Sequence, residues 1–369
     1  MKYYIIAGEA SGDLHGSNLM KALYKKDPDA DMRFWGGDLM QKTGGTLVKH
    51  YRDLAFMGFI EVIFNLKTIL GNIKICKEDI LAFQPDVIIF IDYPGFNMRI
   101  AKWAKEFGIK THYYISPQIW AWKENRITDI KRDVDKMFVI LPFEKDFYEK
   151  KHNFPVEFVG HPLIDAIHNR IPVDTDFRKE NKLDEKPIIA LLPGSRKQEI
   201  SKMLEVMLSV VYDFPDYQFV IAGAPSQEFS FYEQFLNNKN VHFISNKTYD
   251  LLSISHVALV TSGTATLETA LFKVPQVVCY KGSWASYQIA KRVVTLKFIS
   301  LVNLIMDKEV VTELIQEKCN SKSIKTELRK ILDPESRKQV LYQYDVLQTK
   351  LGGIGASEKT ARLIMEDLK

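Results

Sequence analysis

Cysteine is scarce in this sequence. Cys76, Cys279 and Cys319 are the three cysteines among 369 residues, and none belongs to a CxxC pair or to a cysteine and histidine cluster. An odd number at such spacings argues against a disulfide framework and against a zinc site. We therefore expect a protein of a reducing compartment.

Long apolar runs are also lacking. No run approaches the roughly 18 apolar residues that a membrane-spanning helix needs. The short run at residues 3–7 meets Gly8 and Glu9 before the core of a secretion signal could form. We expect a cytoplasmic protein, and any contact that it makes with a membrane must be peripheral.

Charge of one sign is not in excess. Lysine and arginine number 50 against 46 aspartates and glutamates, which leaves a net charge of +4. This balance is too even for a protein that binds nucleic acid by neutralising phosphates, so we expect no nucleic acid partner. A weak attraction to anionic lipid is compatible with it, and so is an ordinary solvated surface.

The sequence does contain a repeated strand and helix pattern. Its length fits two domains, and 46% hydrophobic with 26% charged residues is typical of a globular protein. Apolar runs that end in Gly, Pro or Ser are followed by helical stretches, which predicts α/β domains with parallel sheets. The predicted strands form two series, at 3–7, 87–91, 111–115, 137–141 and 156–159, then at 188–192, 219–222, 257–260 and 274–280.

A polar stretch at residues 165–186, interrupted by prolines, separates the two series and predicts a linker. We place the domain boundary near Asp174. Glycines at 352, 353 and 355 divide the helical C-terminal region into two pieces. The predicted domains are residues 1–173 and 174–339, and the helices at about 340–369 are expected to pack back onto the first domain.

The first strand leads into a small acidic loop at residues 8–13. Ligands of parallel α/β sheets bind beyond the carboxyl ends of the strands, so this loop is a candidate site. Glu9 and Asp13 would repel a pyrophosphate and suit sugar hydroxyls better. Alternatively, Ser11 or Asp13 caps a helix that begins near Leu14.

A second candidate follows the strand at 87–91. Asp92 stands at the carboxyl end of that strand, partly shielded by Tyr93 and Phe96, where its pKa could rise and it could accept a hydroxyl proton. We predict that Asp92 is the general base. The alternative is that its carboxylate only bonds the amides of the turn.

Two of the five tryptophans lie in the loop at 116–122, beside Lys123 and Arg126. Three roles stay open for such a loop: its aromatic rings stack on sugars, they insert into a lipid interface, or they pack in a buried contact between sheet and helix. Upstream, residues 61–77 carry apolar side chains at helical spacing, which usually marks a core helix. The same stripe would also serve as an interfacial helix or as the wall of a groove for acyl chains.

The second half contains two loops suited to an anion. At residues 191–196, Gly194 permits close approach of the backbone, the following helix start offers free N–H groups, and Arg196 can hold a diphosphate. At residues 260–268, small hydroxyl residues open another helix, and Glu268 could bind ribose hydroxyls. A solvated Arg196 and a supported helix start at Thr264 are the alternatives.

Motifs for cofactors and metals are missing. The glycines at 8, 12 and 16 do not have the GxGxxG spacing, which counts against NAD or FAD, and we expect no cofactor. The DxD-like pairs at 27–31, 133–135 and 174–176 do not follow a strand end, so we interpret them as turns and predict metal independence. Together the loops suggest a nucleotide-sugar donor held across a cleft from its acceptor.

Several of these segments, in order along the chain, make the sequence resemble the lipid-A-disaccharide synthase family. The similarity spans nearly the whole chain, and this family has the GT-B fold, with two facing Rossmann-like domains and a cleft between them. So many ordered matches are improbable by chance. The matching segments are residues 7–13, 57–62, 91–97, 116–122, 141–144, 160–162, 192–196, 262–268, 303–304 and 313–314.

The resemblance implies an inverting glycosyltransferase. It joins UDP-2,3-diacylglucosamine to 2,3-diacylglucosamine 1-phosphate and releases UDP and a β-1,6 disaccharide at the inner membrane surface; a homodimer is left open. Asp92 matches the family's proposed general base. The expected UDP-binding residues are Gly194, Ser195, Arg196, Ser262, Gly263, Thr264, Glu268 and Asn303, and the expected acceptor-binding residues are Glu9, Ser11, Gly12, Asp13, Met57, Asn97, Ser116 and Trp120.

Two rival interpretations stay open at this point. A UDP-sugar 2-epimerase would share the fold and the donor site, although it would not explain the apolar helix and the tryptophans. A non-catalytic protein that binds a sugar nucleotide or a lipid would need the donor pocket and could lose Asp92 without consequence.

Overall fold

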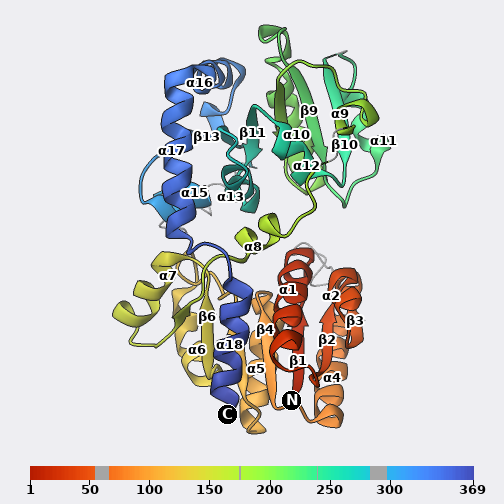
Figure 1. The fold of residues 1–369 in the computed structure, drawn as a ribbon, viewed down its shortest axis with the longest axis vertical. Helices are drawn as coiled ribbons and strands as arrows, with labels where there is room; N and C mark the ends of the chain where they lie inside the picture. Colours follow the sequence, from red (N-terminus) through yellow and green to blue (C-terminus); the bar gives the residue numbers. More distant parts are fainter. Residues whose placement is uncertain (55–65, 174–175, 239, 283–296) are drawn as a thin grey trace. The chain divides into compact units, whose positions relative to one another are not determined.

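The structure is a computed structural model that describes residues 1–54, 66–173, 176–238, 240–282 and 297–369. The chain divides into two compact units, shown in Figure 1. The first comprises residues 1–169 and 351–369, and the second comprises residues 170–350. Each unit contains one parallel sheet, as the α/β pattern predicts.

The sheet of the first unit has seven strands in the order β3-β2-β1-β4-β5-β6-β7. Its strands are β1 (Lys2–Ala7), β2 (Asp31–Gly36), β3 (Thr46–His50), β4 (Val87–Ile91), β5 (Thr111–Tyr114), β6 (Lys136–Val139) and β7 (Glu157–Phe158). Its helices are α1 (Ala10–Lys26), α2 (Asp38–Thr43), α4 (Leu66–Phe83), α5 (Pro94–Glu106), α6 (Ile127–Asp133), α7 (Pro142–Asp146), α8 (Pro162–His168) and α18 (Ala356–Leu368), with short turns η1 (Tyr51–Leu54), η2 (Glu124–Arg126) and η3 (Phe147–Lys151).

The sheet of the second unit has six strands in the order β10-β9-β8-β11-β12-β13. Its strands are β8 (Ile188–Leu192), β9 (Gln218–Gly223), β10 (Val241–Ser245), β11 (Val257–Thr261), β12 (Gln276–Tyr280) and β13 (Glu313–Ile315). Its helices are α9 (Phe177–Glu180), α10 (Lys197–Leu208), α11 (Phe229–Tyr232), α12 (Thr248–Ile254), α13 (Thr264–Leu271), α15 (Leu301–Met306), α16 (Ser321–Leu332) and α17 (Pro334–Lys350), with 3-10 turns η4 (Val211–Asp213), η5 (Glu233–Phe235) and η6 (Gln316–Lys318).

The central strands owe their position to unbroken apolar sequence. Strands β4 (VIIFI) and β8 (IIALL) are buried along their whole length. In β8, Ile189 and Leu191 enter one hydrophobic cluster, whereas Ile188 and Ala190 enter another. A strand that is apolar on both faces is stable only when both faces are covered, which is the usual condition of a parallel sheet.

Helix α1 begins earlier than the sequence predicted. It starts at Ala10 rather than near Leu14, because Glu9 is extended and takes the N-cap position. Ser11, Gly12 and Asp13 therefore belong to the first helical turn and not to a loop. This shortens the connection after β1.

Helix α4 has a core face and an exposed face. Cys76 and Ile80 lie in the hydrophobic core of the first unit, whereas Leu70, Ile75 and Leu81 are exposed. The start of the predicted helix, residues 61–65, lies outside the described residues. Among the helices that the structure describes, none combines the length and the apolar character needed to cross a membrane.

The C-terminal helix α18 packs on α1 and α8 of the first unit. Helix α17 belongs to the second unit and continues unbroken to Lys350. The chain therefore returns to the first unit at residue 351, later than the expected position near residue 340. Gly160 and Gly352 meet at this crossover, where a Cβ on Gly352 would lie 3.1 Å from the Gly160 Cα. The predicted boundary near Asp174 lies outside the described residues.

Asp165 on α8 forms hydrogen bonds to the start of α18. Its Oδ1 accepts the Gly355 N–H at 2.7 Å and its Oδ2 accepts the Ser357 N–H at 2.9 Å, so the carboxylate stabilises the start of the last helix. The Asp165 side chain is buried, and only 4% of the residue is exposed.

We predict that Asp165→Ala lowers the free energy of unfolding by about 1–3 kcal/mol, because two buried N–H groups lose their acceptor. Urea unfolding followed by circular dichroism measures this change. Asp146→Ala is the matched control, because Asp146 makes an exposed ion pair with Lys150 whose loss costs at most about 1 kcal/mol. Equal unfolding midpoints for the two variants would contradict the role of Asp165.

Candidate functional sites

In the first unit, the strand order reverses between β1 and β4, which pair through Ala7 and Ile91. Loops that leave adjacent strands in opposite directions open a crevice at the carboxyl ends, where ligands of such sheets bind. Glu9 follows β1 and Asp92 follows β4. The structure thus brings these two predicted site residues to one edge of one sheet.

Asp92 begins a strained turn. Its φ is +45° and that of Tyr93 is +49°, so two consecutive residues with side chains occupy the left-handed region. Such conformations cost on the order of 1–3 kcal/mol each and persist where the surroundings enforce them. Here the Asp92 carbonyl accepts the Asn97 Nδ2 at 2.7 Å and the Tyr113 hydroxyl at 2.6 Å.

The surroundings of the Asp92 carboxyl group raise its pKa toward neutrality. Burial raises its pKa to about 6, the negative charge of Glu9 adds to this, and the backbone N–H of Tyr93 opposes it. The charge of Glu144 raises it further. A carboxylate with such a pKa is ionised at pH 7 and still basic enough to accept a hydroxyl proton.

Asp13 and Asn97 have supporting roles in the structure. The carboxylate of Asp13 is buried and accepts the N–H groups of Gly37, Leu39 and Met40 at 2.8–3.0 Å, which fixes the start of α2. Asn97 is fully buried and donates to the carbonyl of Asp92. Their direct contact with a sugar stays a prediction.

The remaining acceptor residues differ in exposure. Ser11 is exposed on the first turn of α1, whereas Gly12 is buried, and a Cβ there would lie 3.1 Å from the Ala7 Cβ. Gly12 thus allows close packing of α1 on β1. Met57 lies outside the described residues.

Ser116 and Trp120 meet at a residue that the sequence analysis did not place in the site. The Ser116 hydroxyl and the Trp120 indole N–H both donate to Glu144 Oε1, at 2.6 and 3.1 Å. Glu144 belongs to the family-like segment 141–144, which was the available signal. Its partners lie on another loop, so its role could not be derived from spacing.

The second unit has its own reversal of strand order, between β8 and β11. A cavity of about 250 Å³ opens at the carboxyl ends of these strands. It contains six of the eight predicted UDP-binding residues. They are Gly194, Ser195, Ser262, Gly263, Thr264 and Glu268.

The loop after β8 is shaped by Gly194. Its φ is +103°, and a Cβ at this position would come within 2.3 Å of a Glu199 carboxylate oxygen. The Ser195 N–H donates to Glu199 Oε2 at 3.4 Å, and Arg196 is the exposed N-cap residue of α10. Arg196 does not line the cavity, and it is free to reach an anion bound at the helix start.

Two polar groups in the cavity suit a hydroxylated ligand. Glu268 accepts the Tyr249 hydroxyl at 2.8 Å; burial raises the pKa of Glu268, and this hydrogen bond lowers it. The hydroxyl of Thr261 is buried and has no hydrogen-bond partner among the residues that the structure describes. The sequence analysis did not single out Thr261, which stands at the last position of β11.

Asn303 supports the cavity indirectly. It is fully buried, and its Oδ1 accepts the N–H groups of Val310 and Val311 while its Nδ2 donates to the Val311 carbonyl and to Glu313. Glu313 also accepts the N–H and hydroxyl of Ser300. The structure therefore assigns Asn303 a positioning role, and direct UDP binding by it stays a prediction.

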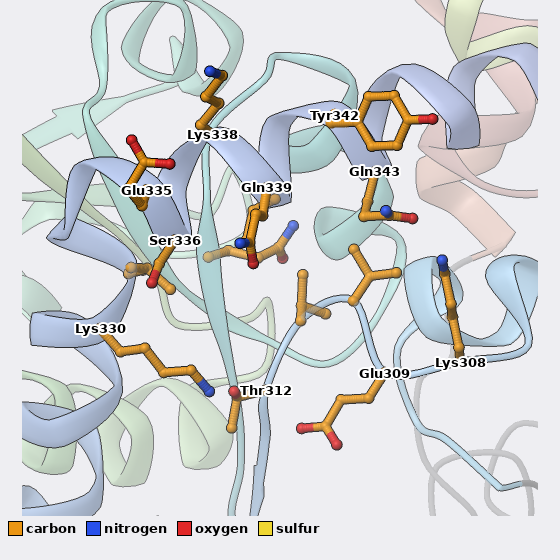
Figure 2. Close-up of a pocket in the computed structure, with 15 residues that line it drawn as sticks. Lys308, Glu309, Thr312, Lys330, Glu335, Ser336, Lys338, Gln339, Tyr342 and Gln343 are labelled. Atoms are coloured by element: carbon orange, nitrogen blue, oxygen red, sulfur yellow. The ribbon is translucent and has the colours of Figure 1, made fainter.

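A larger hollow of about 650 Å³ lies beside α17. Figure 2 shows side chains of both charges around it, among them Lys308, Lys330 and Glu335. It contains none of the predicted site residues and does not lie at the carboxyl ends of the strands. The smaller cavity is thus the one that contains predicted site residues.

Solved structures show which class of fold this is. The chain aligns with the UDP-GlcNAc 2-epimerase from Neisseria meningitidis bound to UDP-GlcNAc, with a TM-score of 0.70 and 13% identity over 99% of this chain and 100% of the other. It also aligns with the glycotransferase of kitacinnamycin, with a TM-score of 0.67 and 13% identity over 100% and 99% of the two chains. The two parallel-sheet units are thus a GT-B-like fold, the class that contains sugar-nucleotide transferases and epimerases.

Sequence comparison identifies the family within that class. The profile of the lipid-A-disaccharide synthetase family matches residues 3–365. The lipid-A-disaccharide synthase of Syntrophus aciditrophicus is 39% identical over 375 residues (99% of this chain, 97% of the relative), and that of Geobacter sulfurreducens is 35% identical over 371 residues (99% and 96%). The chain belongs to the lipid-A-disaccharide synthase family, which makes it a UDP-sugar glycosyltransferase and decides against the epimerase.

We predict that Gly194→Ala weakens UDP binding roughly tenfold or more, because the new Cβ is strained at this φ and collides with Glu199. Isothermal titration calorimetry with UDP measures the change. Gly71→Ala is the control, since Gly71 lies on α4 with open space around it and should leave the affinity unchanged. Wild-type affinity in Gly194→Ala would contradict the placement of UDP at this loop.

Proposed function

We propose that the protein transfers the diacylglucosamine unit of UDP-2,3-diacylglucosamine to the 6-hydroxyl of 2,3-diacylglucosamine 1-phosphate. The products are UDP and the β-1,6-linked disaccharide 1-phosphate. Membership of the lipid-A-disaccharide synthase family supports the choice of substrates. The structural observation that carries the proposal is the half-buried carboxylate of Asp92, with its raised pKa, at the reversal point of the first sheet.

The second unit holds the donor in this proposal. The N–H groups at the start of α10 and the side chain of Arg196 bind the diphosphate, because a helix start and a guanidinium both favour negative charge. Residues 262–264, at the start of α13, add further N–H donors. Glu268 accepts hydroxyls of the ribose, as acidic residues do in other nucleotide-binding sheets.

The first unit activates the acceptor. Asp92 accepts the proton of the 6-hydroxyl while that oxygen attacks the anomeric carbon of the donor. The bond from this carbon to the UDP oxygen breaks, and the electron pair leaves with UDP, whose growing charge Arg196 stabilises. Attack from the face opposite UDP inverts the anomeric centre and gives the β linkage.

We also propose that the protein contacts the inner membrane peripherally. Trp122 is 45% exposed, and the cationic groups of Lys123 and Arg126 lie 4.5 and 5.7 Å from its ring. An exposed aromatic residue beside cations suits the headgroup region of an anionic bilayer. The exposed apolar residues of α4 offer a second contact of the same kind.

A mass-spectrometric assay tests the proposed reaction. Purified protein is given UDP-2,3-diacylglucosamine with and without 2,3-diacylglucosamine 1-phosphate. We expect disaccharide 1-phosphate and UDP in equal amounts, and only when the acceptor is present. Consumption of the UDP-sugar without the acceptor, or no disaccharide with it, would contradict the proposal.

For Asp92→Asn we predict a loss of transfer by a factor of about 10² to 10⁴, the usual contribution of a general base. UDP affinity should stay at the wild-type value, because the donor is held by the second unit. Initial rates of UDP release and calorimetric titration measure the two quantities. A variant that transfers at the wild-type rate would refute the assignment of the base.

A further inference from the structure

We propose that Glu144 is a positioning residue of the acceptor site, which fixes the loop of Ser116 and Trp120 after β5, the strand that pairs with the strand of Asp92. The inference rests on the proposed function, in which Asp92 is the base. It assigns a task to a carboxylate that does not itself touch the reacting atoms.

The geometry of Glu144 shows what it connects. The residue is 1% exposed. Its Oε1 accepts the Ser116 hydroxyl at 2.6 Å and the Trp120 indole N–H at 3.1 Å, and its Oε2 accepts the N–H groups of Ile140 and Leu141 at 3.1 and 2.8 Å. One side chain thus joins the segments that follow β5 and β6.

Capping of α7 explains only half of these bonds. Glu144 occupies the N3 position of that helix, and Oε2 reaches back to the N-cap residue Leu141 as a capping glutamate does. The other oxygen faces away from the helix backbone and serves two side chains of the β5–α6 connection. A residue that was only a cap could stand on the surface, whereas Glu144 is buried.

The partners of Glu144 favour its ionised form. Two backbone N–H groups and an indole N–H can only donate, so they match an acceptor without a proton. Burial raises the pKa of Glu144, and the four hydrogen bonds oppose this effect. The carboxylate is therefore a buried negative charge that hydrogen bonds stabilise in place of a cation.

The loop that Glu144 holds contains backbone strain. Ile115, which precedes Ser116, has a φ of +65°, an unfavourable value for a β-branched residue. The Tyr148 hydroxyl donates to the Pro117 carbonyl at 3.2 Å, and the Phe143 ring meets the Trp120 ring edge to face at 4.9 Å. Contacts from residues 143–148 thus enforce a conformation that the loop would not adopt alone.

The charge of Glu144 also acts on the base. Negative charges near a carboxylate disfavour its ionisation, so Glu9 just before α1 and Glu144 on α7 both raise the pKa of Asp92, beyond the larger effect of burial. Replacing Glu144 by a neutral residue should lower the pKa of Asp92. The base then stays ionised to lower pH. Among the residues that the structure describes, Tyr93 on the same turn and Tyr113 on β5 are further titratable groups around Asp92, and both have a raised pKa.

The test is Glu144→Gln, which keeps the shape of the side chain and removes its charge. Its NH₂ group must face N–H donors, so the loop should lose its fixed position. We expect kcat/KM for the acceptor to fall by roughly 10- to 100-fold, the scale of a small misplacement of reacting groups. The acid limb of kcat/KM, near pH 6 in the wild type, should move to lower pH.

Three variants serve as comparisons. Glu9→Gln should move the acid limb in the same direction, since Glu9 shares the electrostatic effect. Glu149→Gln, which replaces a partly exposed glutamate on η3, should leave the limb in place. Ser116→Ala keeps the charge of Glu144 and removes one loop contact, so it should lower kcat/KM without moving the limb to lower pH; it also serves if Glu144→Gln does not fold.

The outcomes separate this inference from the proposed function. An acid limb of Glu144→Gln at the wild-type pH would overturn the electrostatic part, and a wild-type kcat/KM in both Glu144→Gln and Ser116→Ala would overturn the positioning part. Failure of the proposed function appears elsewhere, as absence of disaccharide from the wild type or full activity of Asp92→Asn. UDP affinity, measured by calorimetry, should be equal in all these proteins.

Discussion

The turn after β4 holds two residues in a backbone conformation that neither prefers. Asp92 and Tyr93 both have positive φ, and the hydrogen bonds from Asn97 and Tyr113 to one carbonyl keep them there. The ring of Tyr93 fills the space over Gly8, where any Cβ would lie 2.3 Å from it. The ends of β1 and β4 are therefore packed closely against each other at the turn of Asp92.

Each unit supports its site with a glutamate behind the loops. In the first unit, Glu144 accepts hydrogen bonds from the segments after β5 and β6. In the second unit, Glu313 accepts the N–H groups of Ile299 and Ser300 at 2.9 Å. The carbonyl of Ile299 in turn accepts the hydroxyl of Ser262 at 2.8 Å, which connects Glu313 to the wall of the donor cavity. Such supports reduce the freedom of the loops before a substrate arrives, which lowers the entropic cost of binding.

The sequence predicted the central elements well because their signal is local. Strands β4 and β8 have their predicted bounds, since an unbroken apolar run needs no partner to be recognised. The predicted strands did not include β2 and β3 of the first sheet or β10 and β13 of the second. Strand β2 contains Asp31 and Arg33, β3 and β10 are partly exposed, and β13 has 3 residues, so none of them gives a continuous apolar run.

The site was predictable in its position more than in its contacts. Six of the predicted UDP-binding residues follow strand ends and line one cavity of the second unit, and Asp92 follows the end of β4. The supporting roles of Asp13, Asn97 and Asn303 depend on hydrogen bonds to residues elsewhere in the chain, which spacing does not reveal. Glu144 was missed as a site residue for the same reason.

The first unit is discontinuous, because residues 351–369 return to it after the whole second unit. During synthesis on the ribosome, residues 1–169 emerge first and must wait for the rest of the chain before α18 can cover α1 and α8. Until then α1 and α8 lack the cover of that helix. The first unit is thus made first and completed last, so a prematurely terminated chain would leave it unfinished.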